Sequence, residues 1–120
     1  MQTLILKNYI FEKTFKLKLF NLKKLKLSYV KNIEFYNNSP FQLKNLFILK
    51  SKVKEGKKIN FSELESLSIE EGSTNIFNFD ALKNLKKLII ESYAVLRENN
   101  IFSLSSLEEI EVKKYIYLWL

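Results

Sequence analysis

The chain has 120 residues and a formal net charge of +7, and 47% of its residues are hydrophobic. This composition is globular rather than disordered, and the length suits one domain. The sequence has no cysteine and no histidine, which excludes disulfides, thiolate metal sites and histidine-based catalysis. No apolar run approaches the roughly 18 residues of a membrane span, and no signal peptide is recognisable at the start. The sequence therefore predicts a cytoplasmic protein without a transmembrane segment.

The charge is unevenly distributed along the chain. Residues 1–60 hold 14 Lys and 3 Glu, whereas residues 61–120 hold 5 Lys, 1 Arg, 9 Glu and 1 Asp. The net charge is therefore +11 in the first half and −4 in the second. Two interpretations remain open: a field that steers and orients a partner, or compositional drift without functional meaning.

Six apolar triplets of the form L-x-x-L-x-L recur at intervals of 21, 21, 21, 21 and 22 residues. The triplets are Met1/Leu4/Leu6, Leu22/Leu25/Leu27, Leu43/Leu46/Ile48, Leu64/Leu67/Ile69, Leu85/Leu88/Ile90 and Leu107/Ile110/Val112. A fixed period of this length is typical of a solenoid. The last two apolar residues of each triplet are two apart, which is the spacing of side chains on one face of a strand. We therefore expect parallel strands near 3–7, 24–28, 45–49, 66–70, 87–91 and 109–113, one per coil.

Further apolar residues recur in the return segments between the triplets, and we expect them in the core. They are Leu19, Phe41, Phe61, Leu82 and Leu104 just before a triplet, and Phe11, Ile33, Val53, Ile76 and Val95 about midway. The returns are expected to be irregular, 3-10 or short helices, because a 21-residue unit leaves little room for a long helix. Ser39 with Pro40 is a favourable helix start. Asn60, Asp80 and Ser103 are candidate caps of the equivalent turns.

The six triplets resemble the leucine-rich-repeat (LRR) family, whose repeats carry the same strand pattern with a period of about 20–29 residues. The resemblance implies an α/β solenoid: one domain over residues 1–120, shaped as a horseshoe with about six parallel strands on its concave face and the returns on its convex face. Repeats would start near residues 1, 22, 43, 64, 85 and 107. The family often places Asn or Cys eight residues after the first leucine, where this chain has Tyr9, Val30, Ser51, Gly72, Tyr93 and Tyr115. This departure predicts an irregular, divergent member.

The resemblance also implies noncatalytic recognition of a protein partner through the concave face, without a cofactor. Outward-facing strand positions there form three columns, and Ile5, Phe47, Leu49 and Ile89 are apolar where solvent is expected. Such residues rimmed by charge suit a protein-binding site. The predicted binding residues are Ile5, Lys7, Lys24, Lys26, Phe47, Leu49, Glu70, Lys87, Ile89, Glu91, Glu109 and Glu111. The alternative is that isolated exposed apolar residues carry no function.

Two other side-chain groups were considered as sites. Glu70 and Glu91 share a column on adjacent strands, a spacing compatible with a glycosidase carboxylate pair or a hard cation. A solvated acidic patch balanced by Lys87 and Lys113 is the favoured interpretation, so no catalytic residue and no metal ligand is predicted. A basic group raises nonspecific nucleic-acid binding by the N-terminal half as a second alternative function. It comprises Lys13, Lys16, Lys18, Lys23, Lys24, Lys26 and Lys31, with Phe15, Phe20 and Tyr29 among them.

The ends of the chain suggest a further function. Met1 already occupies a triplet position, and an apolar tail from Tyr115 to Leu120 follows the last triplet. Solenoids normally need polar caps on their terminal repeats. The chain is therefore expected to be a fragment, to use the tail as its own cap, or to form a homo-oligomer end to end through residues 115–120. End-to-end assembly is the first alternative to recognition of a protein partner.

Overall fold

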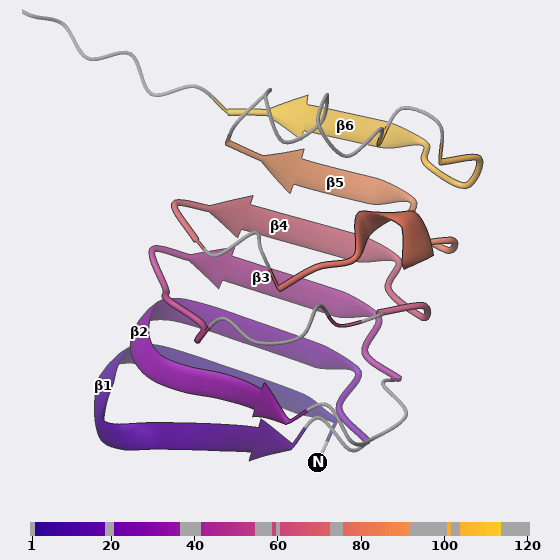
Figure 1. Ribbon diagram of the computed structural model, residues 1–120. Helices are drawn as coiled ribbons and strands as arrows, with labels where there is room; N and C mark the ends of the chain where they lie inside the picture. The colour runs from indigo at the N-terminus through magenta and orange to yellow at the C-terminus, as the bar shows by residue number, and fades with distance from the viewer. Residues whose placement is uncertain are drawn as a thin grey trace, which may run out of the picture.

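The computed structural model describes residues 2–18, 21–36, 42–54, 59, 61–72, 76–91, 101 and 104–113. Its main feature is one parallel sheet of six strands, whose spatial order β1-β2-β3-β4-β5-β6 is also their order in the chain (Figure 1). The strands are β1 Thr3–Lys18, β2 Lys24–Tyr36, β3 Asn45–Leu49, β4 Ser66–Glu70, β5 Lys87–Ile90 and β6 Glu109–Val112. The predicted parallel solenoid is confirmed, with every strand beginning at or next to its expected position.

The strand register follows the triplets. Leu46 of β3 pairs with Leu25 of β2 and with Leu67 of β4, and Leu88 of β5 pairs with Ile110 of β6. Pairing partners are thus separated by 21 residues, or by 22 at the last step, as the sequence spacing predicts. Each coil adds one strand beside the previous one, so identical triplet positions become continuous columns of side chains across the sheet.

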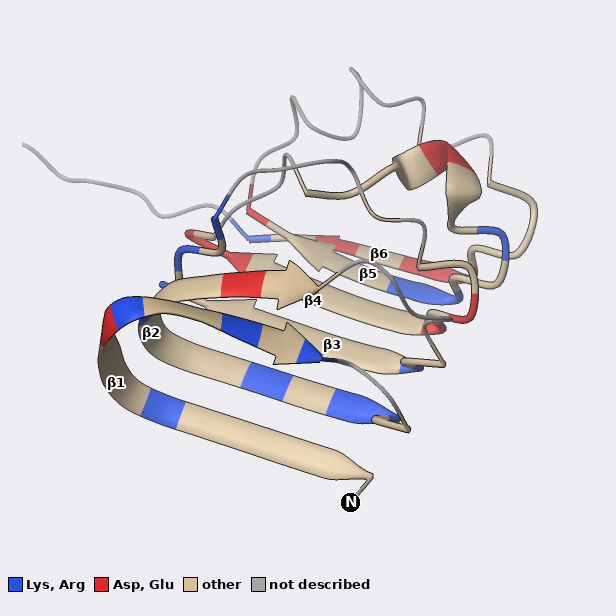
Figure 2. Cartoon of the chain, turned by 60° about the horizontal axis from the view of Figure 1, so that its bottom comes forward, with Lys and Arg blue, Asp and Glu red and all other residues tan. Residues whose placement is uncertain are grey.

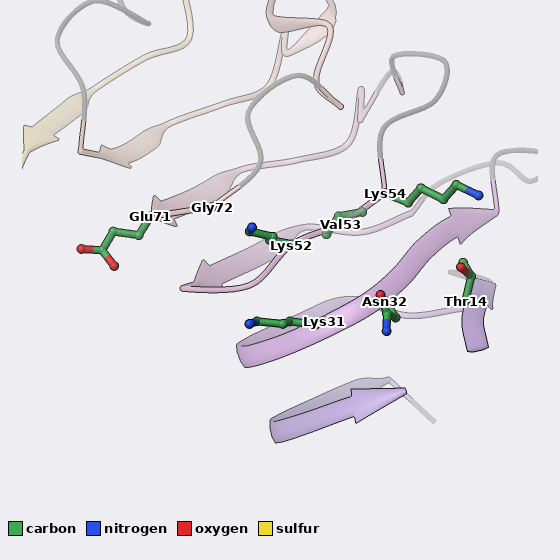
Figure 3. Close-up of a pocket in the computed structure, with 8 residues that line it drawn as sticks. All are labelled: Thr14, Lys31, Asn32, Lys52, Val53, Lys54, Glu71 and Gly72. Carbon is green, nitrogen blue, oxygen red and sulfur yellow. The ribbon is translucent and has the colours of Figure 1, made fainter. Parts of the chain in front are cut away.

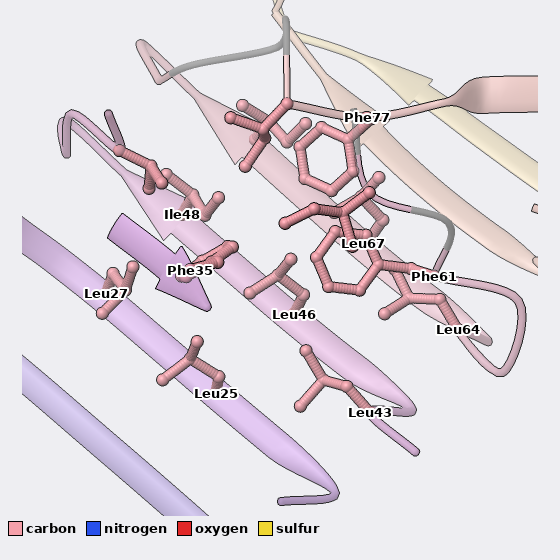
Figure 4. Close-up of a cluster of buried hydrophobic side chains, with 14 of the residues drawn as sticks. Leu25, Leu27, Phe35, Leu43, Leu46, Ile48, Phe61, Leu64, Leu67 and Phe77 are labelled. Atoms are coloured by element: carbon pink, nitrogen blue, oxygen red, sulfur yellow. The ribbon is translucent and has the colours of Figure 1, made fainter. Parts of the chain in front are cut away.

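The inward columns form one hydrophobic core between the sheet and the return segments (Figure 4). All triplet residues of the four middle repeats are buried. The returns contribute an aromatic row in which the ring centroids of Phe35 and Phe61 lie 6.1 Å apart and those of Phe61 and Phe77 lie 5.3 Å apart. The expected return residues Ile33, Val53, Phe61, Ile76 and Leu82 are buried, whereas Leu19, Phe41 and Val95 lie outside the described residues.

The returns of the first two repeats are strands, which the sequence analysis did not anticipate. β1 and β2 continue past the corner of the coil and pair again in a second layer, where Leu17 lies opposite Phe35 (Figure 1). Isolated bridges join Ile33 to Val53 and Ile59 to Phe77. In the described part of the chain, neighbouring coils thus satisfy much of the return backbone, and little helix forms.

The one helix among the described residues is a 3-10 turn, η1, over Phe79–Ala81. Asn78 precedes it without a side-chain cap, and Asp80 lies inside it. The expectation that Asp80 caps this turn is therefore wrong, because the chain enters the turn two residues earlier. The other expected helix starts, at Ser39, Asn60 and Ser103, lie outside the described residues. No helix in the described segments is long and apolar enough to cross a membrane.

A left-handed residue marks the corner after each of the first four strand segments. Asn8, Tyr29, Lys50 and Glu71 have φ values of 54°, 56°, 44° and 49°. Asparagine tolerates this conformation readily, but for the other three it costs roughly 1–2 kcal/mol each. The strain recurs every 21 residues, so the cost is part of the repeat geometry and is offset by the core that each corner closes.

Candidate binding surface on the exposed face of the sheet

The outward positions of the six strands form the expected columns. The register places Lys26, Phe47 and Ser68 side by side on β2, β3 and β4, and Ser68 beside Ile89 on β5. Glu111 follows Ile89 on β6, and Ile5 precedes Lys26 on β1. Adjacent strands are about 4.8 Å apart, so the side chains of one column touch or nearly touch. The predicted assignment of faces is confirmed: Leu46 points inward and is 2% exposed, whereas its neighbour Phe47 is half-buried on the outer face.

A hollow of about 320 Å³ lies on this face above β4. Phe47 forms one wall and Ile89 the opposite wall, while Ser66 and Ser68 lie between them on β4. The hollow exists because β4 has two small side chains where its neighbours have large ones. Lys24, Asn45 and Lys87 complete the lining, together with parts of Leu25 and Leu46.

The hydroxyl of Ser68 has no hydrogen-bond partner among the described residues, although the residue is only 6% exposed. A hydroxyl held in this way loses its hydration and gains nothing in exchange, which costs roughly 1–3 kcal/mol. A ligand group that donates or accepts one hydrogen bond at this point would recover that energy. Ser68 is therefore the polar anchor point of an otherwise largely apolar hollow.

The rim of the hollow is positively charged. The ammonium of Lys26 lies 4.8 Å from the ring centroid of Phe47, a cation–π contact that holds both side chains in place. Lys24 and Lys87 line the hollow itself, and Lys87 also lies 3.9 Å from a carboxylate oxygen of Glu109. The hollow therefore combines apolar walls, one buried hydroxyl and a basic rim.

The two candidate carboxylates at the end of the strands are both engaged in structural contacts. Glu70 is 7% exposed, which corrects the expectation of an exposed residue, and its carboxylate lies 2.7 Å from the ammonium of Lys113. Glu91 accepts a hydrogen bond from the backbone N–H of Glu71. No group of three or more potential metal-ligating side chains occurs in the described segments. The interpretation as a charge-balanced acidic patch fits these contacts better than a carboxylate pair for catalysis.

The predicted binding residues therefore separate into several places. Phe47, Ile89, Lys24 and Lys87 meet at the hollow, and Lys26 joins them through Phe47. Leu49, Glu70 and Glu91 lie at the far end of the strands. Ile5 and Lys7 lie on edge strand β1, and Glu109 and Glu111 lie on edge strand β6. The residues missed by the sequence analysis are Ser66 and Ser68, whose signal was the presence of small side chains between bulky neighbours in the same columns.

A second, more polar cavity of about 700 Å³ lies at the corner of the coils (Figure 3). Lys31 and Lys52, on successive coils, project in the same direction, whereas Lys54 projects to the opposite side (Figure 3). Thr14, Asn32, Val53, Glu71 and Gly72 complete the lining. The amide of Asn32 donates a hydrogen bond to the carbonyl of Phe11, so its side chain is held by the neighbouring coil. The cavity gathers positive charge without converging it on one point.

The fold and the surface together define a parallel β-solenoid with a basic-rimmed hollow on its exposed sheet face. Comparison of the chain with protein-family models, with curated proteins and with solved structures finds no significant match.

Proposed function

We propose that the protein is a noncatalytic recognition module, which binds an extended segment of a protein partner on the exposed face of the sheet. The observation that carries the proposal is the unpartnered hydroxyl of Ser68 in the hollow between Phe47 and Ile89. The resemblance to LRR proteins, including a horseshoe curvature with this face as its concave side, belongs to the same proposal. So does a cytoplasmic site of action, which the lack of cysteine favours.

The shape of the hollow favours a protein segment over a compact small molecule. The floor made by Ser66 and Ser68 runs along β4, with apolar walls on β3 and β5. An extended segment places every second side chain on one side, so one apolar side chain would fill the space beside Phe47 and Ile89. A polar group next to it would reach the Ser68 hydroxyl. Binding energy would then concentrate in a small central anchor, as in other protein interfaces.

The side chains of this surface support binding rather than catalysis. Enzymes place perturbed acids, bases or nucleophiles in their clefts, whereas the hollow is lined by lysine, serine, asparagine and apolar residues. The nearby Glu70 is held by Lys113. We therefore assign no reaction to this surface.

Selection from a displayed library of random peptides tests the proposal. Wild-type protein should enrich peptides with a shared apolar position, and the Phe47→Ala and Ile89→Ala variants should lose them. Tyr29→Ala is a matched control because Tyr29 is also an exposed aromatic with a lysine over its ring, Lys50 at 5.5 Å. The proposal is overturned if the folded Phe47→Ala and Ile89→Ala variants bind the enriched peptides as tightly as the Tyr29→Ala control.

Polyanion binding at the corner cavity is a second candidate, favoured by the three lysines that line it. The ammonium groups of Lys31, Lys52 and Lys54 would contact phosphates without reading a sequence. Anisotropy of a labelled single-stranded oligonucleotide tests it. Affinity should fall steeply with salt, and a Lys31→Gln, Lys52→Gln double variant should weaken it. A salt-independent affinity, or one unchanged in that variant, would eliminate this candidate.

A further inference from the structure

The first coil exposes side chains of a kind that the second coil buries. Leu4, Leu6 and Tyr9 pair with Leu25, Leu27 and Val30, which are all 0% exposed. Leu4 and Leu6 are only half-buried, however, and Tyr9 is 53% exposed. In the second layer Phe15 is 43% exposed, whereas its partner Ile33 is fully buried. These residues belong to inward columns, and they are exposed because β1 is an edge strand.

The last coil shows the same incomplete burial. Leu88 and Ile90 of β5 are buried, while their partners Ile110 and Val112 on β6 are only half-buried. Strand β6 is the opposite edge of the sheet. The two ends therefore display the same inward columns, one facing each way along the solenoid.

The two ends also carry opposite charge. The first coil has Lys7, Lys13, Lys16 and Lys18 against one acid, Glu12, whereas Glu108, Glu109 and Glu111 surround β6 with Lys113. Basic residues gather at the β1 and β2 end of the molecule, and acidic ones at the β5 and β6 end (Figure 2). An end-to-end contact between two copies would bring these opposite charges together.

We propose that copies of this chain stack head to tail, with β6 of one copy paired in parallel with β1 of the next. The contact would extend the column of Leu67, Leu88 and Ile110 with Leu4 of the second copy, in the register that joins successive coils within the chain. Open edge strands are ready templates for such pairing. A head-to-tail contact does not close on itself, so assembly would give open-ended oligomers.

A symmetric contact between two β1 edges is the main alternative. It would also cover Tyr9 and Phe15, but it would bring two basic coils together and leave β6 uncovered. Charge therefore favours the head-to-tail mode. The predicted assembly through residues 115–120 concerns a segment outside the described residues, so the edges of β1 and β6 carry this proposal. It is independent of recognition at the hollow on β3–β5.

Sedimentation velocity of the full chain over a range of concentrations tests the proposal. Wild-type protein should show a sedimentation coefficient that rises with concentration. A head-blocked variant, Tyr9→Lys, should stay monomeric because the contact would bury an unpaired ammonium in an inward column. A tail-blocked variant, Glu109→Lys with Glu111→Lys, should associate roughly tenfold more weakly or worse, the equivalent of about 1.4 kcal/mol. Ile10→Lys is the matched control: Ile10 is 64% exposed and pairs with exposed Lys31, so this variant should assemble like wild type.

Mixing the two blocked variants gives the decisive result. One intact tail and one intact head then remain, so an equimolar mixture should form dimers and nothing larger. Thermal melts of each variant establish that it is folded. The proposal is overturned if wild-type protein stays monomeric at all concentrations. It is also overturned if the tail-blocked variant assembles like wild type, which would indicate the symmetric β1 contact, or if Ile10→Lys dissociates the oligomer as fully as Tyr9→Lys does.

Discussion

The hydroxyl of Ser51 accepts a hydrogen bond of 2.9 Å from the backbone N–H of Val30 and thereby ties the third coil to the second. The same hydroxyl donates to the carbonyl of Leu49 at 2.9 Å, and Ser51 is fully buried. Ser51 occupies the position at which LRR proteins often carry asparagine. At this coil a serine therefore meets the need for a buried polar group that bonds the backbone between turns.

We predict that Ser51→Ala destabilises the protein by about 1–3 kcal/mol, because it leaves the buried N–H of Val30 without an acceptor. Urea unfolding monitored by circular dichroism measures the change. Ser62→Ala is the matched control, since Ser62 is exposed, and it should change the free energy of unfolding by less than about 0.5 kcal/mol. Equal stability of the two variants would mean that the Ser51 hydrogen bond contributes nothing net.

Gly72 occupies the same repeat position one coil later, for a different physical reason. A Cβ atom there would lie 2.7 Å from Cγ2 of Ile48 and 3.2 Å from Cγ2 of Ile69. Gly72→Ala should therefore cost about 1–3 kcal/mol through overpacking. In a double-mutant cycle, Ile48→Ala should recover part of this cost because it removes the atom in conflict. Strict additivity of the two changes would contradict a direct clash.

The inward columns could be predicted from the sequence because their cause is local and repeated. A buried strand needs apolar residues two apart, and Leu25, Leu46, Leu67 and Leu88 satisfy that need at a constant period. The constant period also set the register, since each coil must align with the previous one. Faces and neighbours of the strand residues followed from these two facts alone.

Features that depend on contact between coils could not be predicted in the same way. The returns of β1 and β2 became strands because each supplies backbone partners to the other, which no single repeat reveals. Glu70 is buried because Lys113, two strands away, reaches its carboxylate. The hollow depends on a missing side-chain volume at Ser68, and a search for anchoring residues weighs large side chains above small ones.

The contact between Glu70 and Lys113 should contribute more to stability than the contact between Lys87 and Glu109. The first pair is 2.7 Å apart with the Glu70 side chain 10% exposed, whereas the second is 3.9 Å apart with both side chains well exposed. Lys113→Met removes a partner from a mostly buried carboxylate and should cost roughly 1–2 kcal/mol, after allowance for the exposure of Lys113. Lys87→Met should cost less than about 1 kcal/mol. Urea unfolding at low and high salt compares them, and equal losses would contradict the difference in burial.

The position of a coil in the stack should determine how much its leucine contributes. Leu67 is fully buried in the fourth coil, with a paired strand on each side, whereas Leu107 in the last coil is only half-buried. Leu67→Ala should cost about 2–5 kcal/mol, because it removes buried methyl groups and leaves a cavity that the rigid sheet cannot collapse. Leu107→Ala should cost clearly less, since solvent already reaches the site. Denaturant midpoints of both variants, measured at a concentration where wild-type protein is monomeric, make the comparison. If assembly covers the end of the last coil, the cost of Leu107→Ala should grow as the protein concentration is raised, while that of Leu67→Ala should stay constant. A Leu107→Ala cost that equals that of Leu67→Ala in the monomer would instead mean that the last coil is as well packed as the middle of the solenoid.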